Sequence, residues 1–230
     1  MQIGDTGRDI QSVLLTTDIT ENVVNEAIMH GCQLIVSHHP LLFHGLKQIC
    51  GQTPQARSAE LAIKHNIAIY SAHTNLDSVE GGINTRLADK LGITDYRFLT
   101  ESGLGVIGRL KTPMAYEAFL AHVREILQCT YVRYTRPASE QIQTVALCGG
   151  SGAEFIPAAI EQGADVYLTA DCKYHEFQDA DGVIGLIDID HWCSEHHATE
   201  IFRDILSPLS VTCFISEADH TPIKILKAEN

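Results

Sequence analysis

Strand-length apolar runs alternate with helical segments near the start of the chain, and this alternation constrains the fold more than any other feature. The strands and helices expected there are, in chain order, 13–15, 20–28, 34–36, 54–65 and 67–72. Thr20 is suited to cap the first of these helices, and Gly31 is suited to end it. Strand–helix–strand spacing of this kind predicts an α/β fold with a largely parallel sheet.

The middle of the chain is less regular, and a second alternating region follows the glycine-rich residues 149–152. We therefore expect two related α/β lobes with mixed, largely parallel sheets and a metal cleft between them. Residues 1–104 are expected to form the first lobe, and 105–140 an irregular α+β connecting segment. Residues 141–230 are expected to form the second lobe, packed on the first.

The two alternating regions resemble each other. Residues 13–31 align without a gap onto 145–163, with apolar residues and the final glycine in step. Further along, the spacing His73-x-x-x-Asp77 is repeated as His191-x-x-x-Glu195. A recurring supersecondary unit with a recurring polar motif indicates an ancient duplication.

Composition narrows the class of protein. The formal net charge is −13, from 29 acidic against 16 basic side chains, which disfavours nucleic acid or an anionic membrane as partners. No apolar run approaches the roughly 18 residues of a membrane span. The seven cysteines include no C-x-x-C pair, so a reduced, cytoplasmic location is expected. Twelve histidines remain to be explained.

Histidines and carboxylates gather just beyond predicted strands, where parallel α/β sheets bind their ligands. The residues concerned are His38, His39, Asp77, His191 and Glu195. Three imidazoles and two carboxylates suit Zn, Fe, Mn, Co or Ni. Five side chains are too many for one catalytic ion with an open position, so they predict two divalent ions per chain that activate water.

Each of these residues also has a structural interpretation. Adjacent histidines on a strand point in opposite directions, so His38 and His39 can share an ion only on a turn. Asp77 could cap a helix that begins near Gly82. His191 and Glu195 could form an exposed pair one helical turn apart.

Two further histidines are candidate catalytic residues. His73, the repeat counterpart of His191, is expected to donate a hydrogen bond that orients Asp77 or a substrate. His175 follows the strand predicted at 166–169 and is expected to act as a general acid or base. A structural role at the start of a helix is the alternative for His175. No separate cofactor-binding motif is present; the glycines at 149–152 are best explained as a turn.

Four ordered motifs, Ser37–Phe43, Ser71–Asp77, Leu168–His175 and Asp190–Glu195, resemble the GTP cyclohydrolase I type 2 homologues, also called the NGG-one-interacting-factor-three-like family. The resemblance implies two related α/β lobes, a dinuclear metal centre and a toroidal homohexamer. By motif, the family's ligands fall on the same five residues, with Glu195 as the bridging carboxylate. The residue before the late histidine is usually glycine in the family and is Asp190 here.

The expected function is that of a metal-dependent hydrolase-like protein. The family name implies ring opening of GTP or action on another nucleotide-like small molecule. The alternative is a non-catalytic metal-binding ring protein that acts as an interaction or regulatory module.

Overall fold

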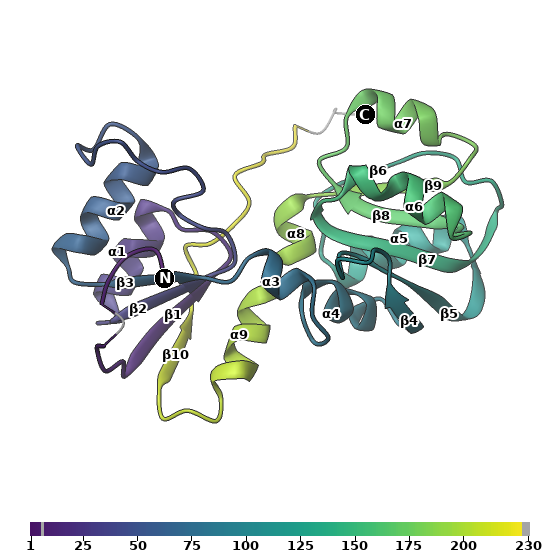
Figure 1. Ribbon diagram of the computed structural model, residues 1–230. Helices are drawn as coiled ribbons and strands as arrows, with labels where there is room; N and C mark the ends of the chain where they lie inside the picture. Colours follow the sequence, from purple (N-terminus) through teal and green to yellow (C-terminus); the bar gives the residue numbers. More distant parts are fainter. Residues whose placement is uncertain (6, 227–230) are drawn as a thin grey trace. The chain divides into compact units, whose positions relative to one another are not determined.

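The computed structural model describes residues 1–5 and 7–226, which divide into two compact units (Figure 1). Unit 1 contains Met1–Leu76 and His196–His220, and unit 2 contains Asp77–Glu195 and the residues from Thr221. No helix in the described part of the chain has both the length and the apolar composition needed to cross a bilayer. The α/β fold class predicted from the sequence is confirmed, with one parallel and one mixed sheet.

Unit 1 is built on a parallel four-stranded sheet in the order β10-β1-β2-β3. Its strands are β1 (Ser12–Thr16), β2 (Leu34–Ser37), β3 (Ala68–Ser71) and β10 (Thr212–Ile215). Its helices are α1 (Glu21–Met29), α2 (Pro54–Lys64) and α9 (Ala198–Leu206). The predicted cap is present, since the Thr20 side chain accepts a hydrogen bond from the Val23 amide.

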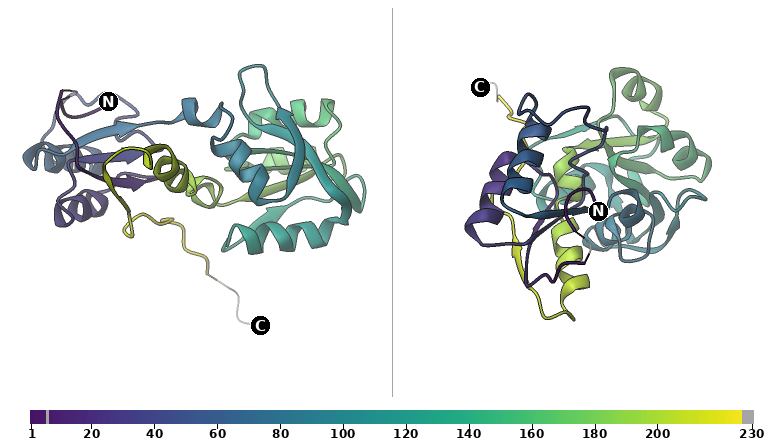
Figure 2. Two further views of the ribbon diagram at one scale, coloured as in Figure 1. Left: turned by 90° about the horizontal axis from the view of Figure 1, so that it is seen from below. Right: turned by 60° about the vertical axis from the view of Figure 1, so that its left-hand side comes forward.

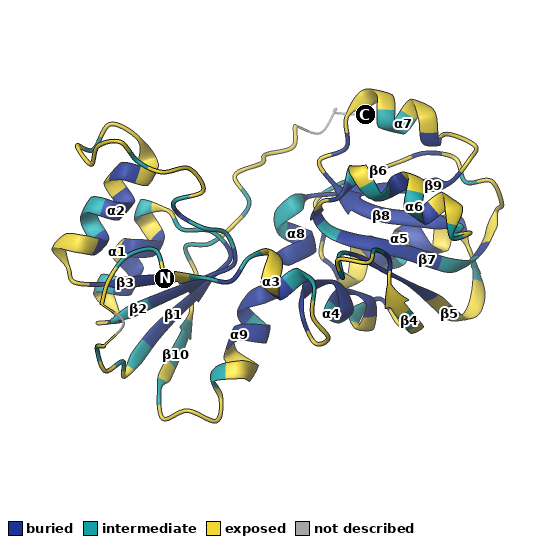
Figure 3. Cartoon of the chain, in the orientation of Figure 1, coloured by how far each residue is buried: buried dark blue, intermediate teal, exposed yellow. Residues whose placement is uncertain are grey.

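Alternation along β1 explains why unit 1 has helices against both faces of its sheet. Leu14 joins the core formed with α1 and α2. Val13 and Leu15 are also buried, and successive strand residues point to opposite faces, so they lie on the other face. Helix α9 packs against β1 and β2. Strands β1 and β2 are accordingly buried at every position after the first (Figure 3), as in other parallel sheets covered by helices.

Unit 2 contains a mixed six-stranded sheet in the order β4-β5-β7-β8-β9-β6, seen from other directions in Figure 2. Its strands are β4 (Ile93–Phe98), β5 (Val106–Ala115), β6 (Val132–Tyr134), β7 (Gln141–Ser151), β8 (Val166–Ala170) and β9 (Gly185–Ile189). Its helices are α4 (Ile83–Lys90), α5 (Tyr116–Ile126), the 3₁₀ turn η1 (Ala153–Phe155), α6 (Ile156–Glu161), α7 (Tyr174–Ala180) and α8 (His191–Glu195). Strands β7, β8 and β9 are parallel, and the others pair antiparallel.

The two faces of this sheet carry separate cores. One core joins the sheet to α4 and α5, and the other joins it to α6 and α7. The segment 105–140, expected to be a connection, supplies β5, α5 and β6 to the unit. The compact units thus divide the chain at positions other than 104 and 140, and the domain boundaries expected from the sequence stay a prediction.

The strand pairings of the two units agree with an internal repeat. Val13 pairs with Leu34 in unit 1, and its repeat counterpart Val145 pairs with Val166 in unit 2, at the same spacing along the chain. In each unit the third strand is followed by a short helix. That helix is α3 (Thr74–Asp77) after β3 and α8 after β9. The His-x-x-x-carboxylate motifs therefore occupy equivalent places.

Candidate metal centre

The end of β2 places two imidazoles in unit 1. After β2 the main chain stays hydrogen-bonded to the end of β1, because the amides of His38 and His39 donate to the carbonyls of Thr16 and Thr17. Ser37 supports the bend, because its hydroxyl donates to the His39 carbonyl 2.7 Å away. The residues lie beyond the strand, so strand alternation does not separate their rings. The ring centroids of His38 and His39 are 4.9 Å apart.

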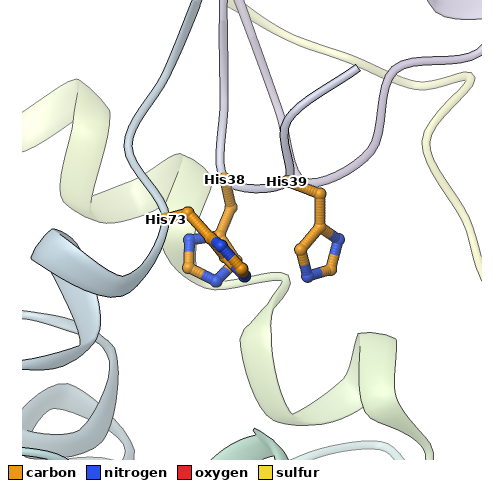
Figure 4. A group of neighbouring side chains, drawn as sticks. All are labelled: His38, His39 and His73. Carbon is orange, nitrogen blue, oxygen red and sulfur yellow. The ribbon is translucent and has the colours of Figure 1, made fainter. Parts of the chain in front are cut away.

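His73, just beyond β3, completes a three-imidazole group in unit 1 (Figure 4). Its ring centroid lies 5.3 Å from that of His38 and 5.6 Å from that of His39. One nitrogen from each ring lies within 4.8 Å of the others, so the three side chains could hold a metal ion. The structure thus places His73 beside the two predicted ligands of unit 1.

Two of these rings are oriented through Nδ1. His38 Nδ1 lies 3.0 Å from the Ala72 carbonyl oxygen, and His39 Nδ1 lies 2.9 Å from Asp18 Oδ1. A metal-binding histidine usually donates one ring N–H to a carboxylate or a carbonyl and presents its other nitrogen to the ion. Both contacts have this form and leave Nε2 as the ring nitrogen that could bind an ion.

In unit 2 the predicted ligands His191 and Glu195 lie together on α8. His191 Nε2 is 3.0 Å from Glu195 Oε2, and His191 Nδ1 is 2.6 Å from Asp171 Oδ2. Glu195 is 4% exposed, which excludes the exposed-pair interpretation. Burial alone would lower the pKa of His191, but its hydrogen bonds to Asp171 and Glu195 raise it to about 10.

Asp190 explains how α8 begins. Its Oδ1 accepts a hydrogen bond from the Cys193 amide, as a helix-capping residue does, and its Oδ2 accepts one from Thr221. Both oxygens of the Asp190 carboxylate are therefore used inside the fold. Cys193 itself is buried in the core, as expected for a packing residue.

Asp77 ends α3 and is half-buried. Helix α4 begins after Gly82 without a side-chain cap, so Asp77 is not its cap. The pKa of the Cys148 thiol is raised to about 12, chiefly because the thiol is buried. The negative charges of Asp77 and Glu195 are the next largest causes. This part of unit 2 therefore has a negative potential suited to cations.

A close approach of the main chain surrounds the Glu195 carboxylate. Gly150 has a φ of 63°, and a Cβ there would lie 3.0 Å from Glu195 Cδ and 3.2 Å from His191 Nε2. The Gly150 amide donates to Ser194 Oγ at 2.8 Å. Only glycine fits between this strand and the two predicted ligands. The donor types and this cradle both fit a bound metal ion.

His175 lies on the exposed surface of α7. Its interactions among the described residues are local, a 3.4 Å hydrogen bond with Gln178 and a ring contact with Tyr174. Its catalytic role stays a prediction.

Sequence reasoning missed Asp18, Asp171 and Gly150. Asp18 and Asp171 each lie within two residues of the carboxyl end of a parallel strand, so the strand-end rule could have included them. Gly150 was noted only as part of a turn, whereas it belongs to β7 and faces Glu195.

Comparison with known proteins shows the family to which the chain belongs. A model of the family described as Duf34/NIF3 (NGG1p interacting factor 3) matches residues 1–222. The chain belongs to the Duf34/NIF3 family. The resemblance inferred from the four sequence motifs is thereby confirmed.

Two relatives from bacteria are each named GTP cyclohydrolase 1 type 2 homolog. The relative from Streptococcus pneumoniae is 36% identical over 196 residues, covering 81% of this chain and 74% of the relative. The relative from Nostoc sp. is 38% identical over 206 residues, covering 86% and 78%. Among solved structures, the Staphylococcus aureus hypothetical protein SA1388 superposes with a TM-score of 0.90 at 27% identity, covering 97% of this chain and 90% of that one. This chain and the Staphylococcus aureus protein thus share their fold over nearly the whole length of both.

Proposed function

We propose that this Duf34/NIF3 protein is a metal-dependent hydrolase-like protein with a dinuclear site. The proposed ligands are His38, His39, Asp77, His191 and Glu195, with Glu195 shared by the two ions. The observation that carries the proposal is that the imidazoles of His38, His39 and His191 are all held in the same way. Each has its Nδ1 hydrogen-bonded to a protein oxygen, which belongs to Ala72, Asp18 and Asp171 respectively.

Both proposed carboxylate ligands lie where the chain passes from one unit to the other. The chain passes between the two units at Leu76–Asp77, at Glu195–His196 and at His220–Thr221. Asp77 and Glu195 lie at the first two of these crossings. His73 and Asp77 are joined by the single turn of α3, and His191 and Glu195 by the single turn of α8.

Two divalent ions bound there would supply activation of water and polarisation of a substrate oxygen or ring. Asp18 and Asp171 hold the Nδ1 atoms of His39 and His191, so Nε2 of each ring would be the atom offered to an ion. His73 is proposed to orient Asp77 or a substrate. Its position beside His38 and His39 also fits a direct ligand role. His175 is proposed as an acid or base.

The proposed substrate class is GTP or another nucleotide-like small molecule, and the proposed assembly is a homohexamer. The substrate class rests on the family resemblance and on the names of the relatives, and the assembly rests on the family resemblance alone. A non-catalytic metal-binding module is the alternative, and turnover of a nucleotide distinguishes it from the hydrolase.

Elemental analysis of protein purified without a histidine tag tests the site. We expect about two transition-metal equivalents per chain in the wild type and a clear loss in His191→Ala/Glu195→Ala. His65→Ala, at an exposed position at the end of α2, is the control and should keep the metal. Metal content that ignores the double substitution and cannot be restored by reconstitution would overturn the dinuclear site. Metal without GTP turnover would favour the binding module.

A further inference from the structure

The turn between β8 and α7 is held in a strained shape. Asp171 follows β8 directly and has a φ of 59°, in the left-handed region that a Cβ disfavours. Such a conformation persists only where the surroundings over-determine it. Asp171 is also the residue whose carboxylate meets His191 Nδ1 at 2.6 Å. What fixes this turn therefore fixes the orientation of His191.

The ion pair between Arg133 and Asp188 binds both the amide and the carbonyl of the next residue, Cys172. Asp188 Oδ2 accepts a 2.7 Å hydrogen bond from the Cys172 amide. Arg133 Nη2 donates to the Cys172 carbonyl at 3.2 Å. Arg133 and Asp188 bond to each other, with Nε and Nη2 at 3.0 Å and 2.8 Å from Oδ1. The guanidinium also lies 5.0 Å from the ring centroid of Phe177 on α7.

Stability alone does not explain this ion pair. The Asp188 side chain is 1% exposed, whereas that of Arg133 is 50% exposed. A buried carboxylate loses its hydration, and replacing buried ion pairs by apolar residues is often neutral or stabilising. Asp188 lies on β9, which pairs in register with β8 and leads directly into His191. The pair therefore joins the strand that delivers His191 to the turn that delivers Asp171.

We propose that Arg133 and Asp188 form a positioning pair that holds Asp171 against His191. Neither side chain touches the proposed ions; both act through the Cys172 peptide. The inference rests on the proposed function, since it gives the orientation of His191 a purpose in metal binding.

Cobalt(II) is the probe, because its visible absorption reports coordination geometry as well as binding. Wild type, Arg133→Gln, Asp171→Ala and the double variant are titrated with Co²⁺ against a competing chelator. Loss of a partner that orients a metal-bound imidazole costs about 10- to 100-fold in affinity, so Asp171→Ala should lose that much. Arg133→Gln should lose about tenfold, with an altered Co²⁺ spectrum. In the Asp171→Ala background, Arg133→Gln should have no further effect.

Arg136→Gln is the matched control. Arg136 forms a bidentate ion pair with Asp181 in the same unit, and no interaction joins it to the Asp171 turn among the described residues. It should leave both affinity and spectrum unchanged. Arg133→Lys, which keeps the charge but loses the planar fork, gives a milder second variant if Arg133→Gln folds poorly. It should give a smaller loss of affinity of the same non-additive kind.

The outcomes separate the two proposals. Absence of Co²⁺ binding in the wild type would overturn the proposed function itself. The positioning role would be overturned if the wild type binds Co²⁺ normally and Arg133→Gln lowers the Co²⁺ affinity equally in the wild-type and Asp171→Ala backgrounds. An unchanged affinity in folded Arg133→Gln and Arg133→Lys would do the same.

Discussion

Gly150 lies directly against the carboxylate of Glu195. A Cβ at position 150 would lie 3.0 Å from Glu195 Cδ and closer still to its Oε1. The main chain there has a φ of 63°, so both the conformation and the space favour glycine. A residue that a sequence pattern assigns to a turn therefore shapes the wall of the candidate metal centre.

Gly150→Ala is expected to destabilise the protein and to weaken metal binding. The left-handed conformation costs alanine about 1–2 kcal/mol, and displacement of Glu195 should cost a further 1–3 kcal/mol or so, as overpacking does. Thermal unfolding and metal titration measure the two effects. Gly163→Ala is the control, since Gly163 also has a positive φ (75°) but a Cβ there meets nothing within 4 Å. Equal stability and equal metal affinity in the two variants would contradict the steric role of Gly150.

Local patterns were sufficient to predict the elements of both alternating regions. The cap at Thr20, the stop at Gly31 and the strand around Val13 depend on neighbours in sequence, and all three are observed. The partner of a strand depends instead on contacts that span the chain. Strand β10 pairs with β1, and the Asp219 carboxylate accepts the Thr17 amide across 202 positions. Apolar periodicity cannot specify such a pairing.

In the candidate site, too, local patterns indicated some residues, and contacts distant in sequence were needed to find the others. Strand ends and residue type indicated His38, His39 and His191, because parallel α/β sheets bind their ligands beyond the carboxyl ends of the strands. Asp18 and Asp171 are ordinary acidic residues in the sequence. Their importance is evident only from the distances of their carboxylates to the Nδ1 atoms of His39 and His191.

Asp18→Ala is expected to lower metal affinity by about 10- to 100-fold, since it removes the acceptor that orients His39. Asp18→Asn keeps an acceptor oxygen and should retain most of the affinity. Competition with a chromophoric chelator measures both. Asp9→Ala, at an exposed carboxylate in the same unit, is the control and should bind as the wild type does. An Asp18→Ala variant with normal affinity would show that His39 needs no orienting partner.

Glu26 is expected to make unit 1 sensitive to acid. Its buried carboxylate accepts hydrogen bonds from the Ser216 hydroxyl and from the amides of Glu217 and Ala218, the latter two at 2.8 and 3.1 Å. Burial alone would raise the pKa of Glu26, but these hydrogen bonds outweigh it and lower the pKa. A carboxyl group with a lowered folded-state pKa stabilises the fold above its unfolded pKa, about 4.3. That contribution is lost as the pH falls through the folded pKa.

Glu26→Gln should therefore reduce the free energy of unfolding at pH 7 by about 1–3 kcal/mol, and the deficit should shrink below about pH 4. Urea unfolding from pH 3 to pH 7 measures this difference. Glu21→Gln on the same helix is the control. Its ion pair with Arg57 is solvent-exposed, so at most about 1 kcal/mol is expected. A deficit in Glu26→Gln that is constant over the whole pH range would contradict the role of the charge.

Removal of metal by a chelator is expected to lower the melting temperature of the wild type but not that of His191→Ala/Glu195→Ala. An ion that binds the folded state alone stabilises it by RT ln(1 + [L]/Kd), about 4 kcal/mol at a thousandfold excess over Kd. In the metal-free protein the contact between His191 Nε2 and Glu195 Oε2, 3.0 Å apart, would still pair the buried carboxylate, so the fold should survive chelation. Differential scanning calorimetry with and without chelator measures the shift, and zinc added back should restore it. An equal shift in wild type and double variant would place the stabilising metal at residues other than these two.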